Sequence, residues 1–325
     1  MVGKNINNFN LKASPVPKQK INFEQFLLST KFVLNSFKSP KIKNQPLVTI
    51  IIPTFNWSSA LRQTIISILN QNYKNFELLV IGDKCTDDSE EIVNTFKDKR
   101  IKWFNLEKNF GSQFGPNNFG LDIAKGKYVA YINHDDIWLK NHLSWTVYLL
   151  EKYESGLATS NCFAFGPIGT NIFRITNHKI DKMNGSWTPP SSIVHRLDLV
   201  KDIGKWKSFT ETKIPIDTEF ISRFFVKGYG IVKVPTITVV KFPAAWKINS
   251  YLTKTAEQQE LLNHRLLKDK LYVFKQIFRF WISRRKGNVE YNTHSALNIY
   301  SNIKDKDQEF VNYNRKIKGL PKIDV

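Results

Sequence analysis

Between residues 47 and 136, short apolar runs alternate with segments of helical spacing. The first run, residues 47–52 (LVTIII), carries no charge, which is typical of a strand that is covered on both faces. Further runs follow at residues 76–81, 101–106 and 128–132, and the segments between them repeat apolar residues at helical intervals. Strands that alternate with helices of this length favour right-handed crossovers. The sequence therefore predicts an α/β fold with a mainly parallel central sheet flanked by helices.

Two of the intervening helices have recognisable start signals. Ser58 or Ser59 stands where a cap is expected for the segment that continues through Leu61 and Ile65. Asp87 and Asp88 stand at the start of the next helix.

Polar residues follow three of the predicted strands, at 53–56, 82–84 and 133–136. In an open sheet of this kind, ligands bind in the crevice outside the carboxyl ends of the strands. The first of these segments has no glycine, and the chain has no GxxxxGK[ST] motif, so neither dinucleotide fingerprint nor P-loop is present. A bound diphosphate would therefore need a different counter-charge, such as a divalent cation.

Asp135 and Asp136 are the candidates to hold that cation. Magnesium and manganese prefer carboxylate oxygens, and a strand end in a parallel sheet is a suitable position. The alternative is that both aspartates cap a helix beginning near Trp138 or Leu139. The sequence pattern leaves both interpretations open.

The longest stretch without charge, residues 155–173, contains several glycines and a proline, and predicts two short strands around a turn rather than a transmembrane helix. Two cysteines, Cys85 and Cys162, exclude a disulfide scaffold and fit a reducing compartment. The first residues lack the apolar core of a secretory signal. We therefore expect a cytoplasmic protein.

The net charge of +20 is concentrated at the two ends of the chain. Residues 1–46 hold eight basic and one acidic side chain, residues 47–240 hold 23 and 19, and residues 241–325 hold 17 and 8. This distribution predicts a basic N-terminal segment, a near-balanced domain over 47–240 and a basic, aromatic-rich helical C-terminal extension. Basic ends of this kind can simply be solvated, bind nucleic acid, or contact an anionic membrane from its inner face.

Two segments in these ends have helical spacing. Residues 21–38 predict an amphipathic helix, and residues 39–46 read as a linker. Residues 261–286 predict a second helix, which either packs on the central domain or lies in a membrane interface.

The motifs of the central domain occur together in one known family. LVTIIIPTFNWSSALRQTIISILNQNYKNFELLVIGDKCTDDSEEI, continued by NFGSQFGPNNFGLDIAKGKYVAYINHDDIW, resembles the inverting family 2 glycosyltransferases. The resemblance covers roughly residues 46–240. It implies a Rossmann-like GT-A fold in which residues 47–136 bind a nucleotide-diphosphate sugar and residues 137–240 bind the acceptor. It also implies Mn²⁺ or Mg²⁺ as cofactor.

Residue by residue, the resemblance implies a donor site and a metal ligand. Asp135 matches the metal ligand of the family's D-x-D motif, whose first aspartate is replaced by asparagine here, and Asp136 is a second candidate. Gly82 likewise replaces the first of the family's paired aspartates. The residues implied to bind the nucleotide sugar are Pro53, Thr54, Asn56, Asp83, Asn118, Asn133 and His134.

The resemblance also implies a catalytic base near residue 217. The segment PIDTEFISR resembles the family's E-D segment with its following arginine, Arg223, and this alignment places Asp217 at the base position. Glu219 is the alternative base. An aspartate at this point would also favour the N-terminal end of a helix dipole.

Further residues between the two halves are candidates for acceptor or diphosphate contacts. Trp187, His195 and Asp136 are predicted at the acceptor site, and Arg196 is predicted to reach the nucleotide sugar. Packing in the domain core is the alternative for each of them.

Together these features predict a metal-dependent inverting glycosyltransferase that transfers a sugar to a hydroxyl of a glycan or lipid-linked acceptor in cell-surface polysaccharide or glycolipid synthesis. A sugar-phosphate nucleotidyltransferase is one alternative. A non-catalytic basic protein that binds nucleic acid is another, but no nucleic-acid partner is expected because the central domain is nearly balanced in charge.

Overall fold

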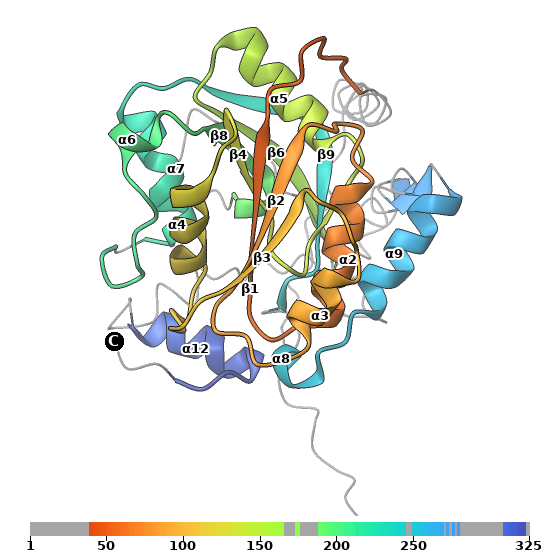
Figure 1. Cartoon of the computed structure of the whole chain (residues 1–325), viewed down its shortest axis with the longest axis vertical. Helices are drawn as coiled ribbons and strands as arrows, with labels where there is room; N and C mark the ends of the chain where they lie inside the picture. Colours follow the sequence, from red (N-terminus) through yellow and green to blue (C-terminus); the bar gives the residue numbers. More distant parts are fainter. Residues whose placement is uncertain are drawn as a thin grey trace, which may run out of the picture.

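In the part of the chain that the structure describes, a nine-stranded sheet lies between two layers of helices (Figure 1). The computed structural model describes residues 39–165, 173–175, 188–212, 214–244, 249–269, 271–272, 275–276, 278–279 and 308–322. The strand order is β3-β2-β1-β4-β8-β6-β9-β5, with β7 paired to β6. The predicted α/β fold with helices flanking a central sheet is therefore confirmed, but the sheet as a whole is mixed rather than mainly parallel.

The first half of the sheet is parallel, as its alternating pattern predicts. Strand β1 (Val48–Thr54) pairs in parallel with β2 (Phe76–Gly82) and with β4 (Tyr128–Tyr131), and β2 pairs with β3 (Ile101–Asn105). Because β1 lies between β2 and β4, the strand order reverses at the carboxyl ends of β1 and β4. A ligand crevice is expected at such a point.

The second half is mixed. Strand β8 (Ile193–Arg196) is antiparallel to β4 and to β6 (Leu157–Phe165), and β9 (Ile231–Lys241) is parallel to β6. The edge strand β5 (Ile137–Trp138) is antiparallel to β9. The strand pair predicted in the uncharged stretch is present as β6 and β7 (Phe173–Ile175), which are antiparallel.

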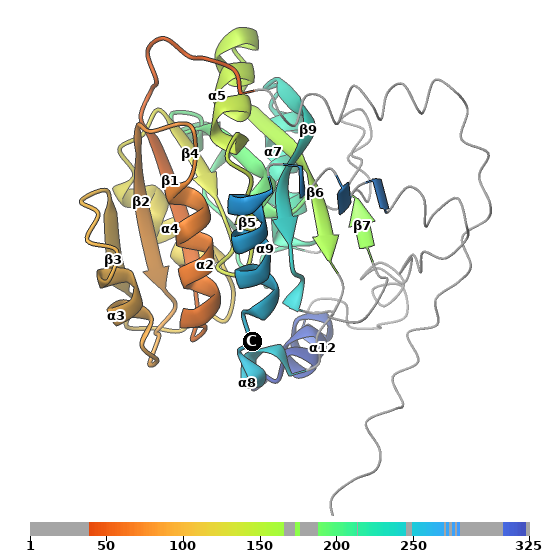
Figure 2. The same cartoon turned by 90° about the vertical axis from the view of Figure 1, so that its right-hand side faces the viewer.

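Each face of the sheet has its own apolar core. Helices α2 (Ser58–Leu69), α3 (Ser89–Asn94) and α5 (His142–Tyr153) contribute Leu61, Val93 and Leu143 to one core. The core on the other face includes side chains from α4 (Phe114–Ile123), α6 (Val200–Ile203) and α7 (Ile216–Val226). Figures 1 and 2 show α2 and α4 on opposite sides of the sheet.

Two predictions about the starts of helices are wrong. No serine side chain caps α2; instead the Asp87 carboxylate accepts a hydrogen bond from the Ser58 backbone N–H at 3.1 Å. Asp87 also accepts from the Ser89 N–H and hydroxyl at the start of α3, so one carboxylate serves two helix ends. No helix begins near Trp138 because that residue lies in β5, and the capping interpretation of Asp135 and Asp136 is therefore wrong.

The described residues of the C-terminal part include three helices that return to the domain. α9 (Glu257–Lys268) packs on α2, where the Asn263 amide donates to the backbone and side-chain oxygens of Gln63. This confirms packing for α9, whereas most of residues 270–307, and the predicted helix at 21–38, lie outside the described residues. α8 (Ser250–Thr253) and α12 (Gln308–Lys318) lie below the carboxyl edge of the sheet (Figure 2). Among the described helices, none is long and apolar enough to cross a bilayer.

Candidate active site

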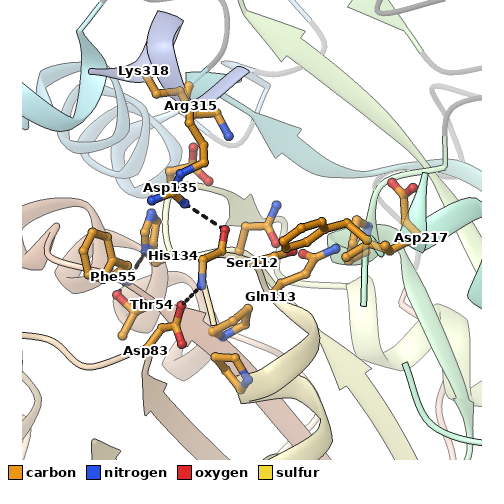
Figure 3. Close-up of a pocket in the computed structure, with 18 of the residues that line it drawn as sticks. Thr54, Phe55, Asp83, Ser112, Gln113, His134, Asp135, Asp217, Arg315 and Lys318 are labelled. Atoms are coloured by element: carbon orange, nitrogen blue, oxygen red, sulfur yellow. Dashed lines mark hydrogen bonds between the residues drawn. The ribbon is translucent and has the colours of Figure 1, made fainter. Parts of the chain in front are cut away.

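A cavity of about 500 Å³ opens at the carboxyl edge of the sheet, where the strand order reverses. Its walls come from the segments that follow β1, β2 and β4, from the loop before α4, from the start of α7, and from α8 and α12. Figure 3 shows Asp83 and Thr54 on one side of this cavity, and Asp217 on the other. Segments more than 200 residues apart in the chain therefore share one pocket.

Asp83 is held rigidly at the end of β2. Its two carboxylate oxygens accept backbone N–H bonds from Phe110 at 2.8 Å and Gly111 at 3.0 Å. Burial raises the pKa of Asp83 to about 6, although these two bonds and the nearby Arg315 work to lower it. A fixed carboxylate of this kind can accept hydrogen bonds from a ligand through its remaining lone pairs.

His134 is a neutral, fully bonded part of the cavity wall. Its Nδ1 accepts a hydrogen bond from the Phe55 backbone N–H at 3.3 Å and lies 3.0 Å from the Thr54 hydroxyl, so we assign the ring proton to Nε2. Nε2 lies 3.1 Å from the hydroxyl of Tyr251. Burial lowers the pKa of His134 to about 4, which keeps the ring uncharged at neutral pH. The imidazole thus connects the β1 and β4 loops with α8.

Asp135 is the residue best placed to hold a divalent cation. It lines the cavity beside Asn133 and is only 7% exposed. No group of three or more His, Cys, Asp or Glu side chains is arranged for a metal within the described ranges. However, a magnesium-like ion needs only one or two protein carboxylates when the phosphates of a substrate supply further oxygens. A single buried carboxylate at a cavity wall fits that mode of binding.

Asp136 has a different role from the one expected. Its side chain is fully buried and forms an ion pair with Lys241 at the end of β9, and it accepts a hydrogen bond from the Ser191 hydroxyl. Burial raises the pKa of the Asp136 carboxyl, and the Lys241 ammonium opposes that rise. Asp136 does not line the cavity, so the structure contradicts its assignment as a metal ligand or acceptor contact.

Replacing Lys241 by methionine is expected to lower the free energy of unfolding by about 3–5 kcal/mol, because Asp136 would remain as a buried charge without its partner. Chemical denaturation at pH 7 measures this loss. In the double variant with Asp136→Asn, most of the stability should return, since no uncompensated charge then remains. If both proteins unfolded at the same denaturant concentration, the ion pair would not be the reason for the loss.

The structure separates the two candidate bases. Asp217 lies in the first turn of α7 and lines the cavity, and burial raises the pKa of its carboxyl. The Glu219 carboxylate lies 2.9 Å from the Lys207 ammonium and 3.1 Å from the Arg223 guanidinium, and it does not line the cavity. This geometry favours Asp217 as the group that can meet a substrate.

Two residues predicted at the site lie at the opposite edge of the sheet or inside it. Arg196 pairs with Tyr128 at the amino end of β4, because β8 runs antiparallel, and its guanidinium binds Asp198. His195 is fully buried, and its Nε2 lies 2.9 Å from the Tyr131 hydroxyl. Both predictions are therefore wrong in position.

Two asparagines predicted at the site form hydrogen bonds with loop backbone and do not face the cavity. The Asn118 amide forms a reciprocal pair with the backbone of Trp206, at 2.8 and 2.9 Å. The Asn56 side chain accepts a bond from the Thr86 backbone N–H at 2.7 Å, which links the β1 and β2 loops. Neither residue lines the cavity. Trp187 lies outside the described residues.

Several residues that line the cavity belong to no site predicted from the sequence. Tyr251 of α8 and the basic residues Arg315 and Lys318 of α12 contribute to its wall. The excess of basic residues in the C-terminal part was visible in the sequence, but no local pattern connected residues 308–322 with the strand ends.

A mixed α/β sheet with a ligand cavity at the carboxyl edge of its parallel half is the arrangement of the GT-A fold. Solved structures share this fold. S. aureus TarS 1-349 in complex with UDP-GlcNAc matches with a TM-score of 0.51, at 20% identity over 61% of this chain and 58% of that one. The mannosyltransferase PcManGT from Pyrobaculum calidifontis in complex with GDP-Man and Mn²⁺ also matches with a TM-score of 0.51, at 16% identity over 70% of each chain.

The sequence comparisons define the family. The model of Glycosyl transferase family 2 matches residues 49–219, which is more than half of the chain, and the chain belongs to this family. An uncharacterized glycosyltransferase from Haemophilus influenzae is 36% identical over 143 residues, covering 42% of this chain and 56% of that protein. The Escherichia coli UDP-Glc:alpha-D-GlcNAc-diphosphoundecaprenol beta-1,3-glucosyltransferase WfaP is 35% identical over 118 residues, covering 36% and 46%. The matched region thus spans about half the length of these relatives.

Proposed function

We propose that this protein transfers a sugar, with inversion, from a nucleotide-diphosphate donor to a hydroxyl group of a glycan or lipid-linked acceptor. The observation that carries the proposal is the cavity in which Asp83 and Asp135, on the side of the β1, β2 and β4 loops, share one space with Asp217 of α7. Family membership and the fold both agree with such a use of the site.

The donor occupies the side of the cavity nearest β1 and β2 in this proposal. Asp83 accepts hydrogen bonds from the base, and Pro53, Thr54 and Asn133 line the space for the ribose. Asp135 would hold Mn²⁺ or Mg²⁺ against the diphosphate. When bound, such a cation stabilises the negative charge that grows on the leaving diphosphate.

Asp217 acts on the acceptor. Its carboxylate takes the proton of the acceptor hydroxyl while that oxygen forms a bond with the anomeric carbon. The bond between the anomeric carbon and the diphosphate oxygen breaks in the same step, and the electron pair leaves with the nucleoside diphosphate. Because the nucleophile attacks opposite the leaving group, the anomeric configuration inverts and no covalent enzyme intermediate is needed.

The acceptor class is proposed from the relatives. WfaP and a second E. coli enzyme, WfgD, carry the name of glucosyltransferases acting on a diphosphoundecaprenol-linked sugar. An acceptor of that type lies in a membrane surface, where the basic residues near both ends of this chain would be attracted by anionic lipid. We therefore propose peripheral contact with the inner face of the membrane and a product in cell-surface polysaccharide or glycolipid synthesis.

A screen of nucleotide sugars by thermal shift, with and without Mn²⁺, tests the proposal. The true donor should raise the melting temperature in proportion to the logarithm of its concentration, because it binds only the folded state. The shift should be larger with Mn²⁺ than with EDTA. If no nucleotide sugar gave a shift, and the protein instead released pyrophosphate from a nucleoside triphosphate and a sugar phosphate, a nucleotidyltransferase would replace the proposed function.

A further inference from the structure

Helix α12 lies outside the residues that the family model matches, yet it forms part of the cavity wall. Two hydrogen bonds to other parts of the chain hold it there, and a third lies within its own segment. The Arg315 guanidinium donates from Nη1 to the carbonyl oxygen of Gly111 at 3.0 Å and from Nε to that of Pro321 at 2.7 Å, and the Asn249 backbone N–H donates to the carbonyl oxygen of Ile317 at 2.8 Å. Since Gly111 also donates to Asp83, Arg315 is connected to the proposed base-binding carboxylate through one residue (Figure 3).

The charges that line the cavity suggest why α12 is there. Three carboxylates and three cations reach its wall: Asp83, Asp135, Asp217, Lys241, Arg315 and Lys318. Of the cations, Lys241 is already paired with Asp136. The bonds of Arg315 go to neutral carbonyl groups, and in the part of the chain that the structure describes no carboxylate lies within ion-pair distance of Arg315 or Lys318.

The surroundings of Lys318 disfavour the charge of its ammonium group, and Asp135 opposes this effect. Burial lowers the pKa of its ammonium, while the Asp135 carboxylate works to raise it and the cations of Arg315 and Lys241 lower it further. Two cations side by side at a cavity wall, without bonded carboxylates, are suited to a ligand with more than one negative charge. Phosphate oxygens are such partners for both Arg and Lys.

We propose that Lys318 of α12 binds the diphosphate of the donor and that Arg315 positions this helix, so that α12 completes the nucleotide-sugar site. Lys318 contacts the phosphate oxygens directly. Arg315 is primarily a positioning residue, because its bond to the Gly111 carbonyl oxygen fixes α12 over the cavity. This inference rests on the proposed function and adds to it a diphosphate contact supplied from a segment about 200 residues away from the strand ends.

The alternative is that the two cations only balance the charge of Asp83 and Asp135 in the folded protein. The alternatives differ in what they predict for ligands. A charge-balancing role would change stability when Lys318 is replaced, but it would affect nucleoside mono- and diphosphates alike. If Lys318 contacts the diphosphate directly, replacing it would weaken the binding of a nucleoside diphosphate more than the binding of the monophosphate.

Calorimetric titration of the full chain with nucleoside diphosphates and monophosphates distinguishes these possibilities. UDP, GDP, CDP, ADP and dTDP serve as probes, each beside its monophosphate, in Mn²⁺ and in EDTA. For the nucleotide that binds, Lys318→Met should weaken the affinity for the diphosphate about tenfold or more, as expected for the loss of a charge-assisted bond. The factor by which it weakens the affinity for the monophosphate should be smaller by about threefold or more. The effect should be largest in EDTA. Lys316→Met, an exposed residue of the same helix, is the matched control.

Arg315→Lys provides a second test, because it keeps the charge but cannot form both carbonyl bonds in the same geometry. It should weaken binding of the nucleoside diphosphate by the same factor in Mn²⁺ and in EDTA, as expected of a positioning residue. If Lys318→Met changed diphosphate affinity no more than Lys316→Met, or weakened both nucleotides equally, the diphosphate contact would be refuted. If the wild-type protein bound none of the diphosphates, the proposed function itself would fail.

Discussion

Asp217→Asn is expected to lower kcat for sugar transfer by about 10²–10⁴-fold while leaving donor affinity within about twofold of wild type. The substitution keeps the shape of the side chain in the first turn of α7 but removes its capacity to accept a proton. Asp83, Asp135 and the cations of α12 would still be available to bind the donor. Steady-state kinetics with saturating acceptor, beside calorimetric titration of the donor, measures the two quantities separately.

The pH dependence adds an independent readout. Burial raises the pKa of Asp217, and the carboxyl must be ionised to accept the acceptor's proton. Transfer by the wild-type protein should therefore be present above this raised pKa and be lost as the pH falls through it, starting at a higher pH than for an ordinary aspartate. In Asp217→Asn the residual rate should lack this acid limb.

Glu219→Gln is the matched control, two residues further along α7. Glu219 holds Lys207 and Arg223, so its loss should reduce stability more than catalysis and should leave the acid limb in place. A variant at Asp217 that still transferred at the wild-type rate, together with an inactive Glu219→Gln, would assign the base to Glu219 instead.

The strand ends are the part of the site that the sequence predicts well. The carboxyl end of a parallel strand is set by local pattern alone, since an uncharged run such as 47–52 ends where polar residues begin. Pro53, Thr54, Asp83, Asn133, His134 and Asp135 all line the cavity for this reason. Neighbouring strand ends then meet because the crossovers between them leave little choice of order.

Other parts of the site depend on information that no local pattern carries. Arg196 lies away from the predicted site because the direction of β8 follows from its pairing with β4 and β6, and not from its own sequence. Asp135 and Asp136 are adjacent and chemically identical, and Asp136 does not line the cavity because its carboxylate is bound to Lys241 of β9 and to Ser191. Arg315 reaches Gly111 across 204 positions, a contact that depends on the route of the whole C-terminal part.

Asp135→Ala is expected to reduce the transfer rate by about 10³-fold or more and to abolish its response to Mn²⁺, because a carboxylate that holds the cation against the diphosphate contributes several kcal/mol to the transition state. Transfer by the wild-type protein should rise with added Mn²⁺ and disappear in EDTA. The fold should be retained, since the Asp136–Lys241 ion pair, which holds this loop to β9, is left in place. Circular dichroism and the melting temperature check that point.

Asp88→Asn is the matched control, because Asp88 is an exposed aspartate at the start of α3 whose side chain makes no cap hydrogen bond. It should transfer at the wild-type rate and keep the full response to Mn²⁺. Binding of a nucleoside diphosphate to Asp135→Ala in EDTA should be no weaker than that of the wild-type protein in EDTA, since Lys318 and Arg315 remain in the cavity wall. An Asp135→Ala protein that was still activated by Mn²⁺ would show that the cation is held elsewhere, and the roles of Asp83 and Asp217 around it would then have to be assigned anew.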